Sequence, residues 1–387
     1  MKPLISIITT VYNNEKYIQS AVDSVLSQGI KDMEYIIVDD GSTDRTPAVV
    51  DAIAATDSRI KVIHQNNQWI YAGFNNGIKA ASGEYIYILN SDDRLKEGSL
   101  QKLIAIVEKY HPDVIYTPVM VHKCDENQSI IHEQYFFNGK GIEQDLYIPT
   151  NAALKDNWIR LEKGGYNINQ ANLYKRRLAL EHPFRNDVYG ADYLFNISIA
   201  PYISSAYVMT DPVYDFFIYD KAEMNASDHK YYGYEHSMFT QFYQESVDLL
   251  EWWGIKDTGS YAYFERKRFQ KITPEIRTYS APNCNLTVEE KIARIFTINV
   301  DELLYNLALK LDAMEELEAR VLSGCRELLV SEEIRKDSPY RFVYDLLDGL
   351  LRYEKTPEDM ALIEAAVKHP LNPYKIGQSF LEKCKCS

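Results

Sequence analysis

The first 120 residues alternate between apolar runs typical of buried strands and segments in which apolar residues recur at helical spacing. Strands are expected over residues 4–10, 34–38, 60–64, 83–89 and 113–121. Between the first two, the apolar positions from Ile18 to Leu26 predict a helix that Gly29 ends. Strands that alternate with helices need right-handed crossovers, so the pattern predicts a mainly parallel sheet covered on both faces.

Two short acidic segments each follow one of these expected strands. Residues 38–44 read VDDGSTD and residues 90–93 read NSDD. In open parallel sheets, ligands bind beyond the carboxyl ends of the strands, near the point where strand order reverses. Paired carboxylates there repel each other unless a cation or hydrogen-bond donors compensate them. We therefore expect a metal-assisted site, with turn or helix-cap roles as the alternative and as the preferred reading for Ser42 and Asp44.

Composition narrows the classes of function. A chain of 387 residues is long enough for two or three domains, and 46% apolar with 25% charged residues is typical of globular proteins. A net charge of -14 argues against nucleic-acid binding, which needs clustered lysine and arginine. The five cysteines form no CxxC pair and no zinc-like spacing with histidine, so reduced thiols are expected.

Membrane and export signals are not expected in this sequence. The apolar stretch Leu4–Ile8 is short and leads to no small-residue cleavage site. No apolar run approaches the roughly 20 residues needed to span a bilayer. We expect a cytoplasmic protein without a transmembrane segment, with peripheral contact at the cytoplasmic membrane face left open.

The pattern changes twice beyond residue 120. Residues 121–235 contain many aromatic and turn residues and are expected to build a second wall of the cleft within a domain spanning 1–235. Residues 236–387 are mainly helical in pattern, most clearly over 288–322, 340–351 and 357–367. Because amphipathic spacing usually reflects ordinary helix packing, their role stays open among acceptor binding, homo-oligomerisation and membrane docking.

Four segments occur in an order and spacing similar to those of a known family. They are ISIITTVYN at 5–13, VDDGSTD at 38–44, GIKAASGEYI at 77–86 and LNSDD at 89–93. The N-terminal half thus resembles the family 2 glycosyltransferases, less sharply as far as about residue 230. The resemblance implies a GT-A fold, which is an α/β, doubly wound, Rossmann-like sheet, here followed by the mainly helical C-terminal region. Residues 1–120 would be the nucleotide-sugar-binding half and 121–235 the acceptor-side half.

The same resemblance assigns the donor's base to two residues at strand ends. Thr10 and Asp40 would hold the base, with Tyr12 and Asn75 as further nucleotide-sugar contacts. A carboxylate accepts the imide N–H of uracil or thymine, which cytosine lacks, so a UDP- or dTDP-linked sugar is expected.

The second acidic segment would bind the rest of the nucleoside diphosphate. By resemblance, Asp92 would face the ribose and Asp93 would be the metal ligand. A divalent Mn²⁺ or Mg²⁺ ion suits hard oxygen ligands and neutralises the leaving diphosphate. Asn90 stands where relatives often have a third acid, and Phe74 stands where many have an arginine that contacts phosphate.

An inverting transfer also needs a general base opposite the leaving group. The segment Phe184–Phe195 resembles the acceptor-side motif of the family, and Asp192 is the matching acid. Position 191, often glutamate in relatives, is alanine here. Asp187 is the second candidate for the base, although a turn or cap role is favoured for it.

Several other contacts stay open at this point. The diphosphate would be contacted from residues 215–230, with Lys221, His229 and Lys230 as candidates and a bystander role favoured for each. Trp69 and Tyr71 are assigned equally to the donor pocket or to the core, and Asn169 and Gln170 are candidates for contact with the acceptor.

Other enzyme classes lack their required residues. A haloacid dehalogenase-type phosphatase needs an aspartate where Val38 stands, and residues 9–14 contain neither the GxGxxG of a dehydrogenase nor the loop of a sugar nucleotidyltransferase. The expected function is therefore an inverting, metal-dependent transfer of one sugar to a hydroxyl of a glycan, a lipid-linked saccharide or a protein. The alternative is an inactive nucleotide-sugar-binding scaffold that acts through its helical C-terminal part.

Overall fold

The computed structural model describes residues 2–135, 141–219, 230–298 and 301–331, with the isolated residues 357 and 361. The chain divides into two compact units. The first comprises residues 1–225 and 251–255, and the second comprises 226–250 and 256–387. The expected boundary at residue 235 stays a prediction.

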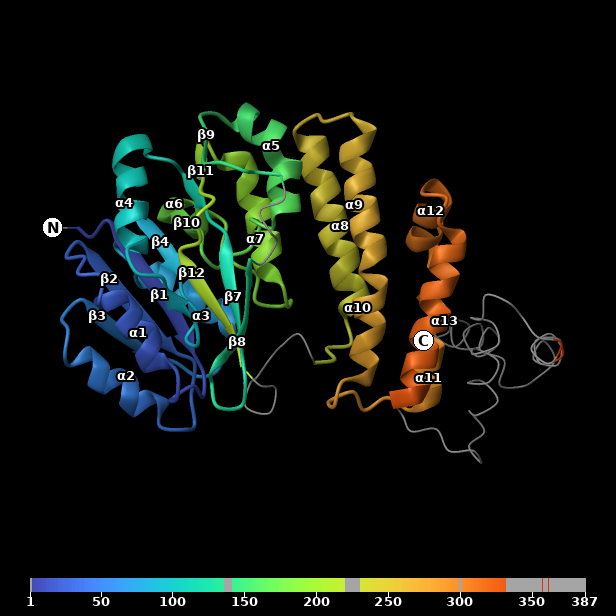
Figure 1. Ribbon diagram of the computed structural model, residues 1–387, viewed down its shortest axis with the longest axis horizontal. Helices are drawn as coiled ribbons and strands as arrows, with labels where there is room; N and C mark the ends of the chain where they lie inside the picture. Colours follow the sequence, from blue (N-terminus) through green and yellow to red (C-terminus); the bar gives the residue numbers. More distant parts are fainter. Residues whose placement is uncertain are drawn as a thin grey trace. The chain divides into compact units, whose positions relative to one another are not determined.

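The first unit is built on an eight-stranded sheet with the order β3-β2-β1-β4-β10-β6-β11-β9 (Figure 1). Its strands are β1 (Ile5–Val11), β2 (Met33–Asp39), β3 (Ile60–His64), β4 (Tyr85–Ile88), β6 (Val114–Tyr116), β9 (Leu146–Ile148), β10 (Leu173–Lys175) and β11 (Ala206–Val208). β1 pairs in parallel with both β2 and β4, and β2 with β3, whereas β10 runs antiparallel to its two neighbours. The expected doubly wound, mainly parallel sheet is confirmed.

A smaller sheet of four strands has the order β5-β12-β7-β8. Its strands are β5 (Arg94–Leu95), β12 (Tyr214–Ile218), β7 (Val119–Cys124) and β8 (Ile130–Tyr135). The single strand predicted over 113–121 is therefore wrong, because it is split between β6 and β7. Pro118 cannot donate a hydrogen bond to a strand ladder, and the chain changes sheet there.

The helices of the first unit lie between these strands in the chain. They are α1 (Ile18–Leu26), α2 (Thr46–Ala54), α3 (Ile70–Ala80), α4 (Ser99–Tyr110), α5 (Asn151–Gly164), α6 (Arg176–Glu181) and α7 (Ala191–Ile199). Two glycines allow α3 to pack closely on β1. A Cβ atom at Gly73 would lie 2.3 Å from Thr10, and one at Gly77 would lie 2.6 Å from Ile8. The first turn of α3 is thereby held beside the carboxyl end of β1.

The described part of the second unit is helical, as the sequence predicted. It contains α8 (Glu235–Trp252) apart from its last two residues, α9 (Thr258–Gln270), α10 (Ile272–Arg277), α11 (Val288–Thr297), α12 (Glu302–Lys310) and α13 (Met314–Ser331). A core that includes Phe269, Ile292 and Leu328 joins most of them. The helices expected over 340–351 and 357–367 lie outside the described residues, apart from 357 and 361.

Ionised side chains also cross-link this unit. His236 of α8 contacts Glu275 of α10 at 2.8 Å and Asp301, the N-cap of α12, at 3.1 Å. Hydrogen bonds to Asp301 and Glu275 raise the pKa of His236 to about 9.

No helix in the described part of the chain is both long enough and apolar enough to cross a membrane.

In the first unit, the buried carboxylate of Glu34 fixes the start of the sheet. It accepts hydrogen bonds from the Ser6 hydroxyl at 2.6 Å and from the Ser82 hydroxyl at 2.8 Å, and it pairs with Lys61 at 2.6 Å. Burial alone raises the pKa of Glu34, but these donors outweigh it and lower the pKa to about 2. The group therefore stabilises the fold above pH 4.5, and this contribution is lost as pH falls towards 2.

We expect Glu34→Gln to lower the free energy of unfolding at pH 7 by about 2 kcal/mol, because an amide is a weaker acceptor for these donors. Chemical denaturation from pH 7 to pH 3 measures the difference, which should shrink below pH 4.5. Glu84→Gln, at an exposed position nearby, is the control and should change stability little at any pH. A pH-independent loss in Glu34→Gln would contradict the charge-based explanation.

Candidate active site

Because β1, β2 and β4 are adjacent and parallel, their carboxyl ends meet at one edge of the large sheet. This edge carries the two acidic segments that the sequence singled out. β2 and β3 lie on one side of β1 and β4 lies on the other. The edge is therefore a point at which strand order reverses, where α/β sheets bind ligands.

Asp39 and Asp40 have different surroundings at the end of β2. Asp39 accepts from the Ser42 N–H at 3.1 Å and contacts His64 Nδ1 at 2.8 Å, which is a turn-stabilising arrangement. Asp40 is buried, and its Oδ1 accepts from Gln65 Nε2 at 2.7 Å and from the Gln68 N–H at 2.9 Å. Among the described residues no donor reaches Asp40 Oδ2, so that oxygen is available to accept from a ligand.

Asp93 is fully buried, and hydrogen bonds engage both of its oxygens. The Tyr214 hydroxyl donates to Oδ2 at 2.6 Å, Asn90 Nδ2 donates to Oδ2 at 3.0 Å, and the Phe217 N–H donates to Oδ1 at 2.9 Å. Burial, together with the neighbouring Asp92 carboxylate, raises the pKa of Asp93 well above its usual value. These bonds tie the end of β4 to β12 of the small sheet. The role of Asp93 as the metal ligand stays a prediction.

Asp92 is only half-buried, unlike Asp93. Burial raises the pKa of Asp92 to about 6. Beside it, Asn90 Oδ1 is buried and has no partner within the described part of the chain. At the end of β1 the same is true of Thr10 Oγ1. Buried polar atoms without partners cost free energy, so this edge is suited to a ligand that supplies what they lack.

The donor set fits a divalent cation that shares its coordination with a substrate. Carboxylate and amide oxygens are the ligands that Mg²⁺ and Mn²⁺ prefer, and a cation would stabilise the ionised forms of two carboxyls whose pKa values burial raises. The described residues contain no cluster of three or more His, Cys, Asp or Glu side chains that forms a complete metal site. Mg²⁺ typically takes only one or two protein carboxylates and completes its shell with phosphate and water.

Asp192 lies in the first turn of α7, half-buried. Burial raises the pKa of Asp192. Backbone N–H donors, among them that of Asn169, oppose this rise, and so does the Tyr71 hydroxyl at 3.3 Å. Gln170, next to Asn169, forms a bridge with Ile88 of β4, two residues before the second acidic segment begins. Short chain segments therefore connect Asp192 to the acidic edge. Asp187, the second candidate for the general base, is exposed and pairs with Arg185 at 2.6 Å.

Three further predicted residues have clear places. Asn75 donates to the Phe184 carbonyl at 2.7 Å and accepts from its N–H at 2.9 Å, so it fastens α3 to the segment before Asp192. Tyr12 is 41% exposed at the end of β1. Trp69 precedes α3 with a φ of 79°, a strained conformation for a bulky residue that is typical of functional sites. Lys221 and His229 lie outside the described residues.

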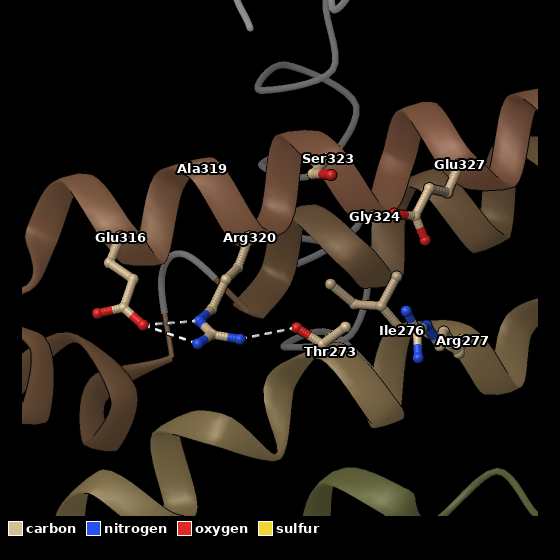
Figure 2. Close-up of a pocket in the computed structure, with 9 residues that line it drawn as sticks. All are labelled: Thr273, Ile276, Arg277, Glu316, Ala319, Arg320, Ser323, Gly324 and Glu327. Carbon is tan, nitrogen blue, oxygen red and sulfur yellow. Dashed lines mark hydrogen bonds and ion pairs between the residues drawn. The ribbon is translucent and has the colours of Figure 1, made fainter.

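A separate pocket of about 300 Å³ lies in the second unit between α10 and α13 (Figure 2). Arg320 spans it, with hydrogen bonds to Glu316 and Thr273. Ile276 and Arg277 line its other side. None of the site residues predicted from the sequence lies in it.

Residues 6–178 match the family described as glycosyl transferase family 2. These residues therefore form a glycosyl transferase family 2 domain. The chain is 40% identical to the glycosyltransferase GlyG of Streptococcus pneumoniae over 116 residues. These residues make up 30% of this chain and 38% of GlyG. The chain is 27% identical over 238 residues to a GalNAc(5)-diNAcBac-PP-undecaprenol beta-1,3-glucosyltransferase of Campylobacter jejuni, which is 60% of this chain and 71% of that enzyme. Against EpsJ of Bacillus subtilis and GlyG, the match spans only about a third of the relative's length.

A solved structure shares the fold of this chain. The crystal structure of S. aureus TarS 1-349 in complex with UDP has a TM-score of 0.53 and 18% identity, covering 85% of this chain and 91% of that one. The expected GT-A fold is thereby confirmed. The sequence motifs did not reveal Tyr214 and Tyr71 as the hydrogen-bond partners of Asp93 and Asp192.

We expect the Tyr214–Asp93 hydrogen bond to be a main attachment of the small sheet. Tyr214→Phe and Asp93→Ala should each lower the free energy of unfolding by about 1–3 kcal/mol. In the double variant the losses should be less than additive by about 1 kcal/mol or more, since one bond is removed in both. Tyr116→Phe is the control, because that buried hydroxyl has no partner among the described residues. Strict additivity in chemical denaturation would refute the shared bond.

Proposed function

We propose that this chain is an inverting, metal-dependent glycosyltransferase that moves a single sugar from a UDP- or dTDP-linked donor to an acceptor hydroxyl. The observation that carries the proposal is the placement of two acids beyond the carboxyl ends of β2 and β4, with a third acid bound to a segment that bridges to β4. Asp40 follows β2, Asp92 follows β4, and Asp192 is connected to that same edge through Asn169 and Gln170. The family 2 match over residues 6–178 supports glycosyl transfer itself.

Donor selection rests on Asp40. Its Oδ1 is held by two donors from the 65–68 loop, which leaves Oδ2 to accept the imide N–H of uracil or thymine. Thr10 Oγ1, buried and without a partner among the described residues, adds a second polar group at the same edge. TarS has been solved with UDP, but its likeness to this chain supports only the fold, so the choice of base depends on Asp40.

The diphosphate would be held through Asp92 and a shared divalent cation. When bound, such an ion neutralises the charge that develops on the leaving nucleoside diphosphate. Asp92 presents a half-exposed carboxylate, whereas both oxygens of Asp93 are already hydrogen-bonded. We therefore propose that Asp92 supplies the more accessible oxygen, and that Asp93, predicted as the ligand, acts on the ion only by giving up one of its present bonds.

The general base would be Asp192. A carboxyl whose pKa burial raises accepts a proton more readily, and α7 and the Tyr71 hydroxyl hold it in place. It would remove the proton of the acceptor hydroxyl as that oxygen attacks the anomeric carbon opposite the leaving group, which inverts the configuration. Asp187 is less suited, because Arg185 pairs with it at the surface and the hydrogen bond lowers its pKa.

The acceptor remains one of three classes, namely a glycan, a lipid-linked saccharide or a protein side chain. The Campylobacter jejuni relative is named for a polyprenyl-linked acceptor, which favours the lipid-linked class. A cytoplasmic location with peripheral membrane contact, and homo-oligomerisation through the helices of the second unit, stay predictions.

Donor binding and slow hydrolysis test the proposal directly. A panel of UDP-glucose, UDP-N-acetylglucosamine, dTDP-glucose and GDP-mannose is titrated by calorimetry with and without Mn²⁺. We expect at least one uridine or thymidine donor to bind only with the ion. Asp92→Asn should weaken this binding about tenfold or more, since it removes the accessible charged ligand.

The same panel separates binding from turnover at Asp192. Asp192→Asn should keep donor affinity and lose about 10²- to 10⁴-fold in turnover. Asp187→Asn is the comparator and should resemble the wild-type protein. Failure of every nucleotide sugar to bind would reject the donor site. Binding without any turnover in the wild-type protein would instead favour the inactive, sugar-nucleotide-binding scaffold.

A further inference from the structure

The ring of Tyr71 is fixed in the first turn of α3. It is only 6% exposed. It stacks on Phe184 with ring centroids 6.1 Å apart and planes 13° apart, and it meets Phe74 edge-on at 6.2 Å. Two aromatic neighbours and burial leave the side chain little freedom, so its hydroxyl has a defined position.

The hydroxyl makes its hydrogen bonds to one short segment of the chain. The Gly190 N–H donates to it at 3.1 Å, and it donates to Asp192 Oδ1 at 3.3 Å. A phenol has one proton, and the Gly190 N–H occupies an oxygen lone pair. The proton is therefore left for the carboxylate. Gly190 has a φ of 77° as the N-cap of α7, so the hydroxyl holds both the cap and the acid that follows it.

The helix that carries Tyr71 also contacts the donor side of the site. Gly73, two residues further on, packs against Thr10 at the end of β1. Asn75 exchanges two hydrogen bonds with the Phe184 backbone. Helix α3 thus links the strand proposed to bind the donor's nucleobase with the segment that presents Asp192.

We propose that Tyr71 is a positioning residue for Asp192, whose hydroxyl orients the carboxylate and stabilises its ionised form during transfer. The inference rests on the proposed role of Asp192 as general base. It concerns a residue that contacts Asp192 directly, and it identifies the side chain that prepares the base for proton removal.

The ionisation states agree with this role. Burial raises the pKa of Asp192, and hydrogen bonds from Tyr71 and from backbone N–H groups oppose the rise. Burial also raises the pKa of Tyr71 well above its usual value, so the phenol keeps its proton at neutral pH. Tyr189 and Tyr174 also interact with this pair, and burial raises the pKa of Tyr174 as well.

Tyr71→Phe tests the proposal in the full chain, with Tyr116→Phe as the matched loss of a buried hydroxyl. Loss of the donor destabilises ionised Asp192, so its pKa should rise. The first readout needs no substrate. It is the titration of the Asp192 carboxyl by ¹³C NMR on aspartate-labelled protein, assigned by the signal that disappears in Asp192→Asn. The second is the pH profile of Mn²⁺-dependent hydrolysis of the UDP-sugar that binds best in the panel.

We expect the acid limb of that profile to move to higher pH in Tyr71→Phe, with about tenfold lower kcat/KM on the limb and unchanged donor affinity. Replacement of Tyr71 by 3-fluorotyrosine, a stronger donor of the same shape, should move the limb to lower pH, and it also serves if Tyr71→Phe does not fold. An unchanged Asp192 titration, or a shift matched by Tyr116→Phe, would overturn the proposal. If Asp192→Asn keeps full turnover, the proposed base is wrong, whatever Tyr71→Phe does.

Discussion

The geometry of the candidate site depends on the hydrogen bonds of the buried Asp93 carboxyl. It lies just beyond β4 of the large sheet, yet two of its three hydrogen bonds come from β12 of the small sheet, through Tyr214 and Phe217. The third comes from Asn90, three residues earlier. The loop that carries Asp92 is therefore closed on itself and fastened to a second sheet. A buried acid with this many donors is costly to remove, and a hydrogen-bonded network of this kind rigidifies the loop.

Asp93 and Asp192 are each held by a tyrosine hydroxyl in the same way. The Tyr214 hydroxyl accepts from the Asn90 N–H at 3.1 Å and donates to Asp93, and the Tyr71 hydroxyl accepts from the Gly190 N–H and donates to Asp192. In each case a phenol locked by burial uses a lone pair on a backbone N–H close to the acid and its single proton on the acid itself. Both the loop and the carboxyl are thus set by one rigid side chain on a different element.

The sequence predicted features that neighbouring residues determine, and it missed hydrogen bonds between residues far apart in the chain. The first four strands, the acidic turns after β2 and β4 and the α/β class follow from apolar period and turn chemistry within about ten residues. The partners of Asp93 and Asp192 do not, because Tyr214 lies 121 residues beyond Asp93 and Tyr71 lies 121 residues before Asp192. Asn75 shows the same limit, since a motif position expected to face the donor is bound to the backbone of Phe184.

Asn90, a departure from the family pattern, is also explained by these contacts. Its amide nitrogen donates to Asp93, while its oxygen stays buried without a partner among the described residues. A carboxylate at this position would only accept, so it would lose the bond to Asp93 and add a third negative charge beside two acids whose pKa values are already raised. The amide supplies the donor that the buried acid needs and keeps one oxygen for a ligand. In this chain the residue that shortens the acidic motif therefore helps to hold the remaining two acids in place.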